Sequence, residues 1–154
     1  MTSSMPALVF AFDVHADVGP PVEIGATHAG RRRVVPIVGG TFDGPDLRGR
    51  VLGGGADWQI VQADGFTELD SRYVLETGEG ELIAVRNRGI RDAAPDVMQR
   101  LLAGELVDPS TVYFKTTPTF ETAAPRLQWL QRAIFLGTGE RRPSSVAIRF
   151  WRVV

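Results

Sequence analysis

Short runs of alternating apolar and polar residues fill most of this chain, and glycine or proline separates one run from the next. A period of two is typical of strands that bury one face. The 41–45 segment, rich in turn-forming residues, predicts a turn, and Pro118 is expected to separate two strands because proline cannot donate a ladder hydrogen bond. The expected strands are 8–14, 23–26, 33–38, 47–52, 58–62, 66–77, 82–88, 112–117, 119–122, 129–136 and 146–154.

The central strands are joined by very short loops. Ala63-Asp64-Gly65 and Gly78-Glu79-Gly80 both combine glycine with an acidic residue, which is a signal for a hairpin. Loops of this length can join only antiparallel neighbours. One segment breaks the pattern: Pro95–Gly104 has proline at its start, Asp96 in the first turn and glycine at its end, as expected of a short helix.

The stretch from Gly39 to Gln59 is the most informative part of the sequence. It holds seven glycines and one proline where two strands are expected. Glycine weakens a strand and usually marks a bulge, a barrel corner or a close backbone approach. We therefore predict an all-β fold, a small antiparallel β-barrel that is closed or nearly closed and has one short helix.

Composition limits the possible functions. A chain of 154 residues is expected to form a single domain, 1–154. The absence of cysteine excludes disulfides, thiolate catalysis and cysteine metal sites. A net charge of −1 with mixed signs gives no reason to expect nucleic-acid or membrane binding. The N-terminal residues resemble neither a signal peptide nor a membrane span, so the expected location is the cytoplasm.

Polar residues on strands that line a barrel are the candidates for chemistry. Asp57 is a candidate general acid or base if Trp58 and other apolar groups desolvate it, although a turn aspartate that accepts backbone N–H groups is the alternative. Arg72 is a candidate oxyanion or carboxylate partner, and an ion pair with Asp70 or Glu68 is its alternative role. Tyr73 is a candidate proton or hydrogen-bond donor, and core packing is its alternative role.

Further residues are candidates for substrate binding: Trp58, Asn87, Tyr113, Glu121 and Trp129. Asn87 shares a strand face with Ile83 and Val85 and is therefore expected to point inward. His15 and His28 are the only histidines, and their spacing matches no His-rich metal site, so we expect no metal. The phosphate-binding and dinucleotide motifs are missing, so we expect no cofactor.

Several segments together resemble the domain of unknown function 3237 family, also called uncharacterised protein family 0311. The matching segments are Val18-Gly19-Pro20, Ile37–Pro45, Gly54–Gln59, Ala63-Asp64-Gly65, Asp70–Tyr73, Val85–Gly89, Tyr113–Pro118, Phe120-Glu121-Thr122 and Trp129-Leu130. The resemblance implies a small barrel, similar to calycin-like and allene-oxide-cyclase-like barrels, and a homo-oligomer. It implies no activity. Gln131 and Lys115 stand where the family usually has Asn and Arg.

These observations favour two functions. The first is a cofactor-independent acid–base enzyme, of isomerase, lyase, hydratase or cyclase type, with Asp57, Arg72 and Tyr73 as catalytic residues. Its substrate would be a small, mostly apolar molecule with a carbonyl or carboxylate group. The alternative is a barrel that binds such a molecule without changing it. A structural or oligomerising module with a filled interior is a third reading.

Overall fold

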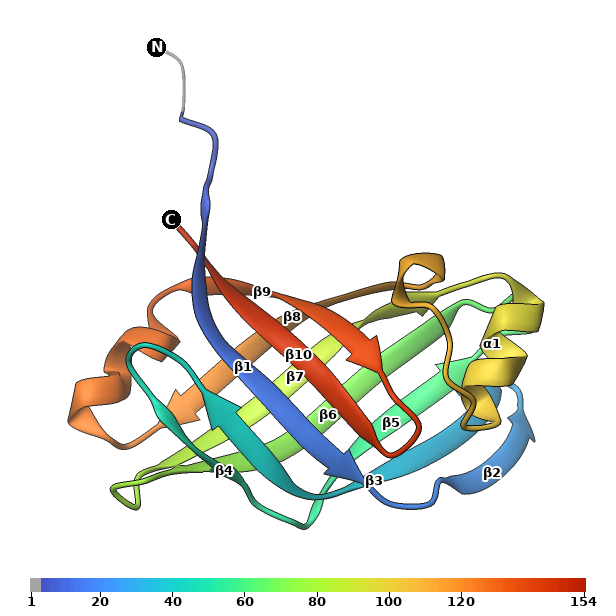
Figure 1. Ribbon diagram of the computed structural model, residues 1–154, viewed down its shortest axis with the longest axis horizontal. Coiled ribbons are helices and arrows are strands. Elements are labelled where there is room, and N and C mark those ends of the chain that lie inside the picture. Colours follow the sequence, from blue (N-terminus) through green and yellow to red (C-terminus); the bar gives the residue numbers. More distant parts are fainter. Residues whose placement is uncertain (1–3) are drawn as a thin grey trace.

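The computed structural model describes residues 4–154, which fold as a barrel of antiparallel strands with helices at its ends (Figure 1). The elements follow in the order β1 (Leu8–Val18), β2 (Val22–Thr27), β3 (Gly30–Asp43), β4 (Arg48–Val51), β5 (Gly55–Val61), β6 (Thr67–Thr77), β7 (Leu82–Asp92), α1 (Pro95–Leu102), η1 (Pro109–Thr111), β8 (Tyr113–Thr122), η2 (Pro125–Gln131), β9 (Ile134–Arg141) and β10 (Ser145–Val153), where η marks a 3-10 helix.

The barrel closes because β1 pairs with β10 on one side and with β3 on the other. Eight strands complete the ring and two more are added to it. β4 and β5 lie end to end between β3 and β6: β4 pairs with the C-terminal half of each, and β5 with the other half. The expected closed antiparallel barrel is therefore confirmed.

The glycines between β3 and β6 allow the strands to approach closely. A Cβ atom built on Gly49 would lie 2.0 Å from the Glu76 carbonyl oxygen, and one on Gly55 would lie 2.5 Å from the Arg72 carbonyl oxygen. No side chain fits at either distance. Of the alternatives expected for the glycine-rich stretch, close backbone approach is found, at the place where one row of the barrel is built from two short strands.

Two prolines lie inside strands without breaking them. Pro36 lies where the neighbour of β3 changes, after β2 has paired as far as Val34 and before β1 pairs from Ile37. Pro118 lies in β8 beyond the two residues that pair with β9. Pro36 therefore interrupts neither the ladder with β2 nor the ladder with β1, and Pro118 does not interrupt the ladder with β9. The expected break at Pro118 was wrong, and so was the turn at 41–45, because β3 continues to Asp43.

The segment 129–136 was expected to be a strand but begins as the end of η2. Leu127 and Leu130 are buried three residues apart, which matches the period of a 3-10 helix. The Gln128 amide donates to the Thr122 carbonyl oxygen at 2.9 Å, and the Thr122 N–H donates to Gln131 Oε1 at 2.7 Å. These bonds replace strand pairing until β9 begins at Ile134.

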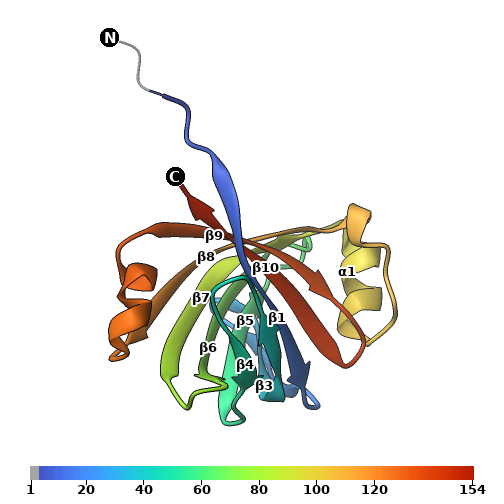
Figure 2. The same cartoon turned by 60° about the vertical axis from the view of Figure 1, so that its left-hand side comes forward.

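The interior divides into an aromatic part and a polar part. Phe12, Phe120 and Phe150 have ring centroids 5.1–5.5 Å apart, and Leu127 and Leu130 of η2 join the same core. At the opposite end, α1 packs Met98 and Leu101 on Val61. Both views show η2 (orange) and α1 (yellow) at opposite ends of the barrel (Figure 2). The polar part between them carries the candidate site.

Within residues 4–154, no helix has the length and apolar character needed to cross a membrane.

Candidate functional site

A small cavity inside the barrel collects polar side chains from several strands. Its volume is about 40 Å³, enough for a few water molecules. Apolar residues form part of the wall: Val14, Ala16, Val18, Val35, Ile37, Leu69, Phe114, Val146 and Ile148. The remaining lining residues are polar: Asp57, Gln59, Ser71, Tyr73, Asn87, Arg91, Thr116 and Arg141.

Strand alternation places these polar groups. Asp57 and Gln59 are two residues apart on β5, as are Ser71 and Tyr73 on β6, so each pair faces inward together. Ser71 lies opposite Asp57 in the β5–β6 ladder. Neighbouring strands thus bring a carboxylate, an amide and two hydroxyls to one wall of the cavity.

Asp57 is held by hydrogen bonds at both carboxylate oxygens. Gln59 Nε2 donates to Oδ2 at 2.8 Å and Ser71 Oγ donates to Oδ1 at 2.8 Å. The side chain is partly buried, and its accessible part faces the cavity. Burial raises the pKa of Asp57, while the hydrogen bonds from Gln59 and Ser71 and the charge of Arg91 oppose that rise. A carboxyl group whose neutral form is favoured in this way can act as a proton donor as well as a proton acceptor.

Tyr73 lies on the same wall with its hydroxyl buried. Burial, and next the charge of Asp57, raises the pKa of Tyr73, so the phenol stays protonated at neutral pH. Its Oη atom has no hydrogen-bond partner among the described residues. Tyr73 can therefore donate a hydrogen bond to an oxygen of a bound molecule.

Three arginines converge on the cavity or its border: Arg33 of β3, Arg91 of β7 and Arg141 of β9. Burial lowers the pKa of Arg91 to about 10, with Asp57 opposing and the other two arginines adding to the fall. Burial also lowers the pKa of Arg33 and of Arg141. Arg33 Nε lies 3.1 Å from Glu23 Oε1, an ion pair without hydrogen-bond geometry.

Four polar atoms on the cavity wall lack a hydrogen-bond partner among residues 4–154. They are Tyr73 Oη, Asn87 Oδ1, Arg91 Nε and Thr116 Oγ1. A buried polar atom left unsatisfied costs about 1–3 kcal/mol. Four such atoms around one space indicate that a bound molecule or water completes their hydrogen bonds.

The cavity reaches the surface beside the β9–β10 hairpin. Val18, Arg141 and Val146 are the lining residues at strand ends there, and all three are partly exposed. β8 pairs with β9 only through Lys115 and Thr116, so the ladder stops before Arg141. Beyond the ladder the wall consists of packed side chains, with the Phe114 ring against Gly139 of β9.

The structure brings three of the predicted site residues together in the cavity: Asp57, Tyr73 and Asn87. The expectation that Arg72 also faces the cavity is not met. Arg72 is exposed on the outer face of β6, one residue out of phase with Ser71 and Tyr73. The alternative role of Arg72, an ion pair with Asp70 or Glu68, is not found among the described residues either, and Asp70 pairs with Arg86 at 3.1 Å.

The remaining predicted residues lie outside the cavity. Trp58 and Tyr113 are exposed large side chains, and Glu121 is exposed on β8. Trp129 lies in η2, partly buried, with its ring 6.1 Å from that of Phe135. None of these four is among the residues that line the cavity.

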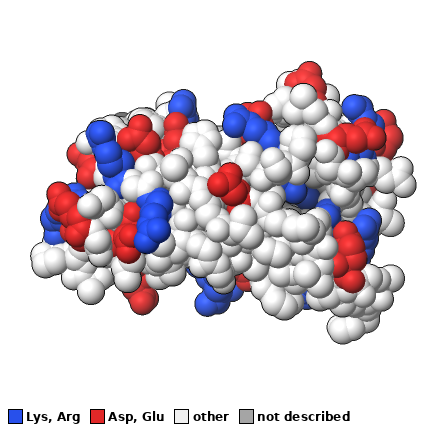
Figure 3. Space-filling view, turned by 60° about the horizontal axis from the view of Figure 1, so that its bottom comes forward, with Lys and Arg blue, Asp and Glu red and all other residues white. Residues whose placement is uncertain are grey.

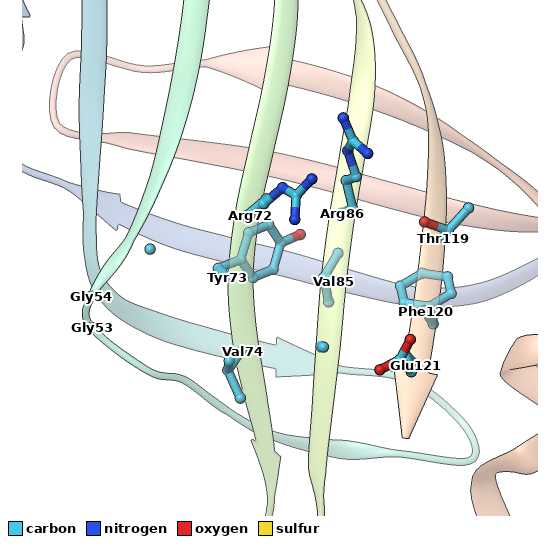
Figure 4. Close-up of a pocket in the computed structure, with 12 residues that line it drawn as sticks. Gly53, Gly54, Arg72, Tyr73, Val74, Val85, Arg86, Thr119, Phe120 and Glu121 are labelled. Carbon is cyan, nitrogen blue, oxygen red and sulfur yellow. The ribbon is translucent and has the colours of Figure 1, made fainter. Parts of the chain in front are cut away.

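A second, wider hollow lies on the outer face of β6, β7 and β8, next to Gly53, Gly54 and Gly55 (Figure 4). Its volume is about 600 Å³, and Arg72 and Glu121 are among its polar groups. These side chains are exposed, so water already solvates their charges. Tyr73, Val85 and Phe120 contribute to its lining, but their side chains are buried. The buried polar groups favour the inner cavity as the site.

Sequence reasoning missed Gln59, Ser71, Arg91, Thr116 and Arg141. Gln59 and Ser71 share strand faces with Asp57 and Tyr73, so the same alternation could have identified them. Arg91 lies four residues after Asn87 on the same face of β7, so a longer strand would have included it. The expected strand ended at Arg88. Arg141 gave no signal, because it lies at the end of β9 and the expected strand ended at residue 136.

Within the described part of the chain, no three His, Cys, Asp or Glu side chains gather in a way that could hold a metal ion.

Comparison with known proteins places the chain in a family. Residues 6–153 match the family described as "Protein of unknown function (DUF3237)". The chain belongs to this family. A UPF0311 protein of Rhodopseudomonas palustris is 38% identical over 145 residues, which cover 94% of this chain and 95% of the relative. The resemblance inferred from the sequence is confirmed.

Solved structures agree with the barrel. A conserved protein of unknown function from Rhodopseudomonas palustris superposes with a TM-score of 0.93 at 35% identity, covering 99% of this chain and all of that one. A more distant relative has a named activity: the hydroalkoxylation enzyme phnH of Penicillium herquei is 23% identical over 148 residues, 96% of this chain and 84% of its own. An enzyme from the same fungus has the same fold, with a TM-score of 0.74 at 20% identity.

Proposed function

We propose that this protein is a cofactor-independent acid–base enzyme whose site is the inner cavity. It acts on a small, mostly apolar molecule that carries a carbonyl or carboxylate group. The observation that carries the proposal is the Asp57 carboxyl group, whose pKa burial raises, at the wall of a cavity with four unpartnered polar atoms. Perturbed ionisable groups beside convergent hydrogen-bond donors are characteristic of catalytic sites.

The cavity supplies groups for each step of an acid–base reaction. Asp57 donates a proton to, or takes one from, a carbon atom of the substrate. Tyr73 Oη and Arg91 Nε, both without partners, donate hydrogen bonds to the oxygen on which negative charge develops. Gln59 and Ser71 fix the orientation of the carboxyl group. Every proton in this scheme moves between substrate and side chain.

The distant relative supports this class of reaction. Hydroalkoxylation adds the O–H of an alcohol across a carbon–carbon double bond. One carboxyl group can deliver a proton to carbon and then recover the proton that the hydroxyl loses when its oxygen bonds to the neighbouring carbon, so atoms and charge balance. The same pair of proton transfers serves an isomerase, a lyase or a hydratase.

The size of the cavity sets a condition on this function. Typical ligand pockets hold roughly 300–1,000 Å³, whereas this cavity holds about 40 Å³. The polar part therefore accommodates the reacting group alone. The remainder of the substrate must enter beside Val18, Arg141 and Val146, and that side of the barrel must widen as it binds.

Turnover tests the proposal directly. We expect the protein to convert at least one member of a panel of hydroxylated aromatic ketones, enones and alkenyl phenols, followed by liquid chromatography and mass spectrometry. Asp57→Asn keeps the shape of the side chain but cannot exchange a proton, so it should lower the rate by about 100-fold or more. Circular dichroism establishes that the variant is folded.

Asp70→Asn is the matched control. Asp70 lies next to Ser71 on β6 but faces outward, paired with Arg86. We expect this variant to keep full activity. Equal rates in Asp57→Asn and the unmodified protein would contradict the assignment of Asp57. Binding of panel members without any turnover would identify a binding barrel rather than an enzyme.

A further inference from the structure

The charges around the cavity do not balance. Arg91 and Arg141 line the cavity together with Asp57, and no ion pair of either arginine with a carboxylate is found among residues 4–154. Arg33 adds a third guanidinium group, partly offset by Glu23, which also pairs with Arg31 at 3.1 Å. Positive charge is therefore in excess in a place that water reaches poorly.

Arg91 is the most buried of the three, with 1% of its surface exposed. Among residues 4–154, its side chain makes a long hydrogen bond of 3.4 Å from Nη2 to Gln59 Oε1. The adjacent Nε–H has no acceptor in the same part of the chain. The Nε and Nη2 hydrogens form the edge of a guanidinium group that fits the two oxygens of a carboxylate.

This excess is a property of the interior and not of the whole protein. The net charge of the chain is −1. The face in Figure 3 carries acidic and basic residues interspersed, without a large patch of one sign. Buried charge is costly unless it is paired, so excess positive charge in the interior of a protein with a net charge close to zero favours an anionic occupant.

We infer that the cavity is an anion subsite, in which Arg91 and Arg141 bind a carboxylate, or an equivalent delocalised oxyanion, of the substrate. The inference deepens the proposed function by naming its substrate class, and it rests on the same cavity. A carboxylate also suits the available space, since three heavy atoms occupy little more than the few water molecules that fit there.

The other unpartnered atoms distinguish an anion from a cation. Thr116 Oγ1 can donate to an oxyanion, as can Tyr73 Oη across the cavity. Asn87 Oδ1 is an acceptor and is left for a hydroxyl of the ligand or for water. With two guanidinium groups beside these donors, an amine would be repelled and a neutral amide would gain little.

Matched aromatic probes test this inference without requiring turnover. We expect benzoate to bind the purified protein in isothermal titration calorimetry at low salt, and benzamide to bind at least about tenfold more weakly. Acetate should compete with benzoate. Arg91→Met and Arg141→Met each remove one charge and should weaken benzoate binding by about 10- to 100-fold.

Arg88→Met is the control, because Arg88 is exposed on the outer face of β7, three residues before Arg91. It should bind benzoate like the unmodified protein. Arg141 is only partly buried, so its variant tests the inference even if Arg91→Met does not fold. Equal affinity for benzoate and benzamide, no binding of either, or unchanged affinity in both cavity variants would overturn the inference. Benzoate binding in a protein that converts no substrate would leave the subsite intact and remove only the catalytic proposal.

Discussion

Asp57 combines two features that pull its protonation in opposite directions. Burial favours the neutral acid, while the hydrogen bonds from Gln59 and Ser71 and the charge of Arg91 favour the carboxylate. Burial is the larger effect, so the native pKa lies above the ordinary value. Burial also disfavours the charged form of the arginines at the cavity and lowers the pKa of each one.

The raised pKa predicts a pH-dependent contribution to stability. Between the unfolded pKa, about 4, and the higher native one, the native state binds more protons at Asp57 than the unfolded state. The free energy of unfolding therefore falls as pH rises through this window. The contribution is fully present below the unfolded pKa and is lost above the native pKa. Asp57→Asn should gain stability relative to the unmodified protein as pH rises.

Urea unfolding between pH 4 and pH 8 measures this difference. Subtracting the two proteins cancels carboxylates whose pKa is lowered by hydrogen bonds, such as Asp70 and Asp108, because both proteins contain them. The groups facing Asp57 are Arg33, Arg91, Arg141 and Tyr73, and they too are common to both. Parallel stability curves would show that the native pKa of Asp57 is ordinary.

At the scale of elements, the glycine-rich stretch makes a local demand that can be tested. A Cβ atom on Gly55 would lie 2.5 Å from the Arg72 carbonyl oxygen and 2.7 Å from Tyr73 Cβ. Gly55→Ala must therefore push β5 away from β6, and we expect it to lower the free energy of unfolding by about 2 kcal/mol or more. Chemical denaturation provides the measurement.

Gly78→Ala is the comparison for this substitution. Gly78 lies in the hairpin after β6, has no positive φ and has no atom within 4 Å of a built Cβ. Its substitution should change the free energy of unfolding by less than about 1 kcal/mol in either direction. If the two alanine variants were equally stable, glycine at 55 would not be needed for strand approach.

The strands and the helix also show which parts of the fold could be predicted from the sequence. Hairpins such as β6–β7 and the helix α1 follow from local rules, namely period-two alternation, Asp-Gly turns and proline at a helix start. Pro118 misled because its tolerance in a strand depends on where the neighbouring strand stops pairing. That is set by closure of the barrel, which no local pattern records.

The candidate site could also be predicted only in part, where strand alternation decides which way a side chain points. Asp57, Tyr73 and Asn87 could be placed inside from strand phase alone. The prediction for Arg72 was wrong, because Arg72 and Tyr73 are adjacent on β6 and therefore point to opposite faces of the strand. Arg91 and Arg141 reach the cavity of Asp57 from β7 and β9, which do not pair with β5. Their convergence depends on closure of the barrel and therefore had no signal in the spacing of residues.

At the scale of the whole molecule, unsatisfied polar groups lie in one part of the barrel interior and packed aromatic side chains lie in the other. This arrangement predicts that some polar side chains in the cavity reduce stability. Thr116 Oγ1 is buried without a partner, so Thr116→Val, which keeps the shape, should raise the free energy of unfolding by up to about 1 kcal/mol. The same change should weaken benzoate binding about fivefold, since one donor is lost.

Thr122 makes the contrast decisive, because it lies on the same strand and the same buried face as Thr116. Its hydroxyl donates to the Leu82 carbonyl oxygen at 2.8 Å and accepts from the Ala124 N–H at 3.1 Å. Thr122→Val should therefore lower the free energy of unfolding by about 1–2 kcal/mol and leave benzoate binding unchanged. Urea unfolding and calorimetry of the two valine variants separate the cases. Equal losses of stability would mean that the Thr116 hydroxyl serves the fold and not a ligand, because only a group that is satisfied in the empty protein stabilises it.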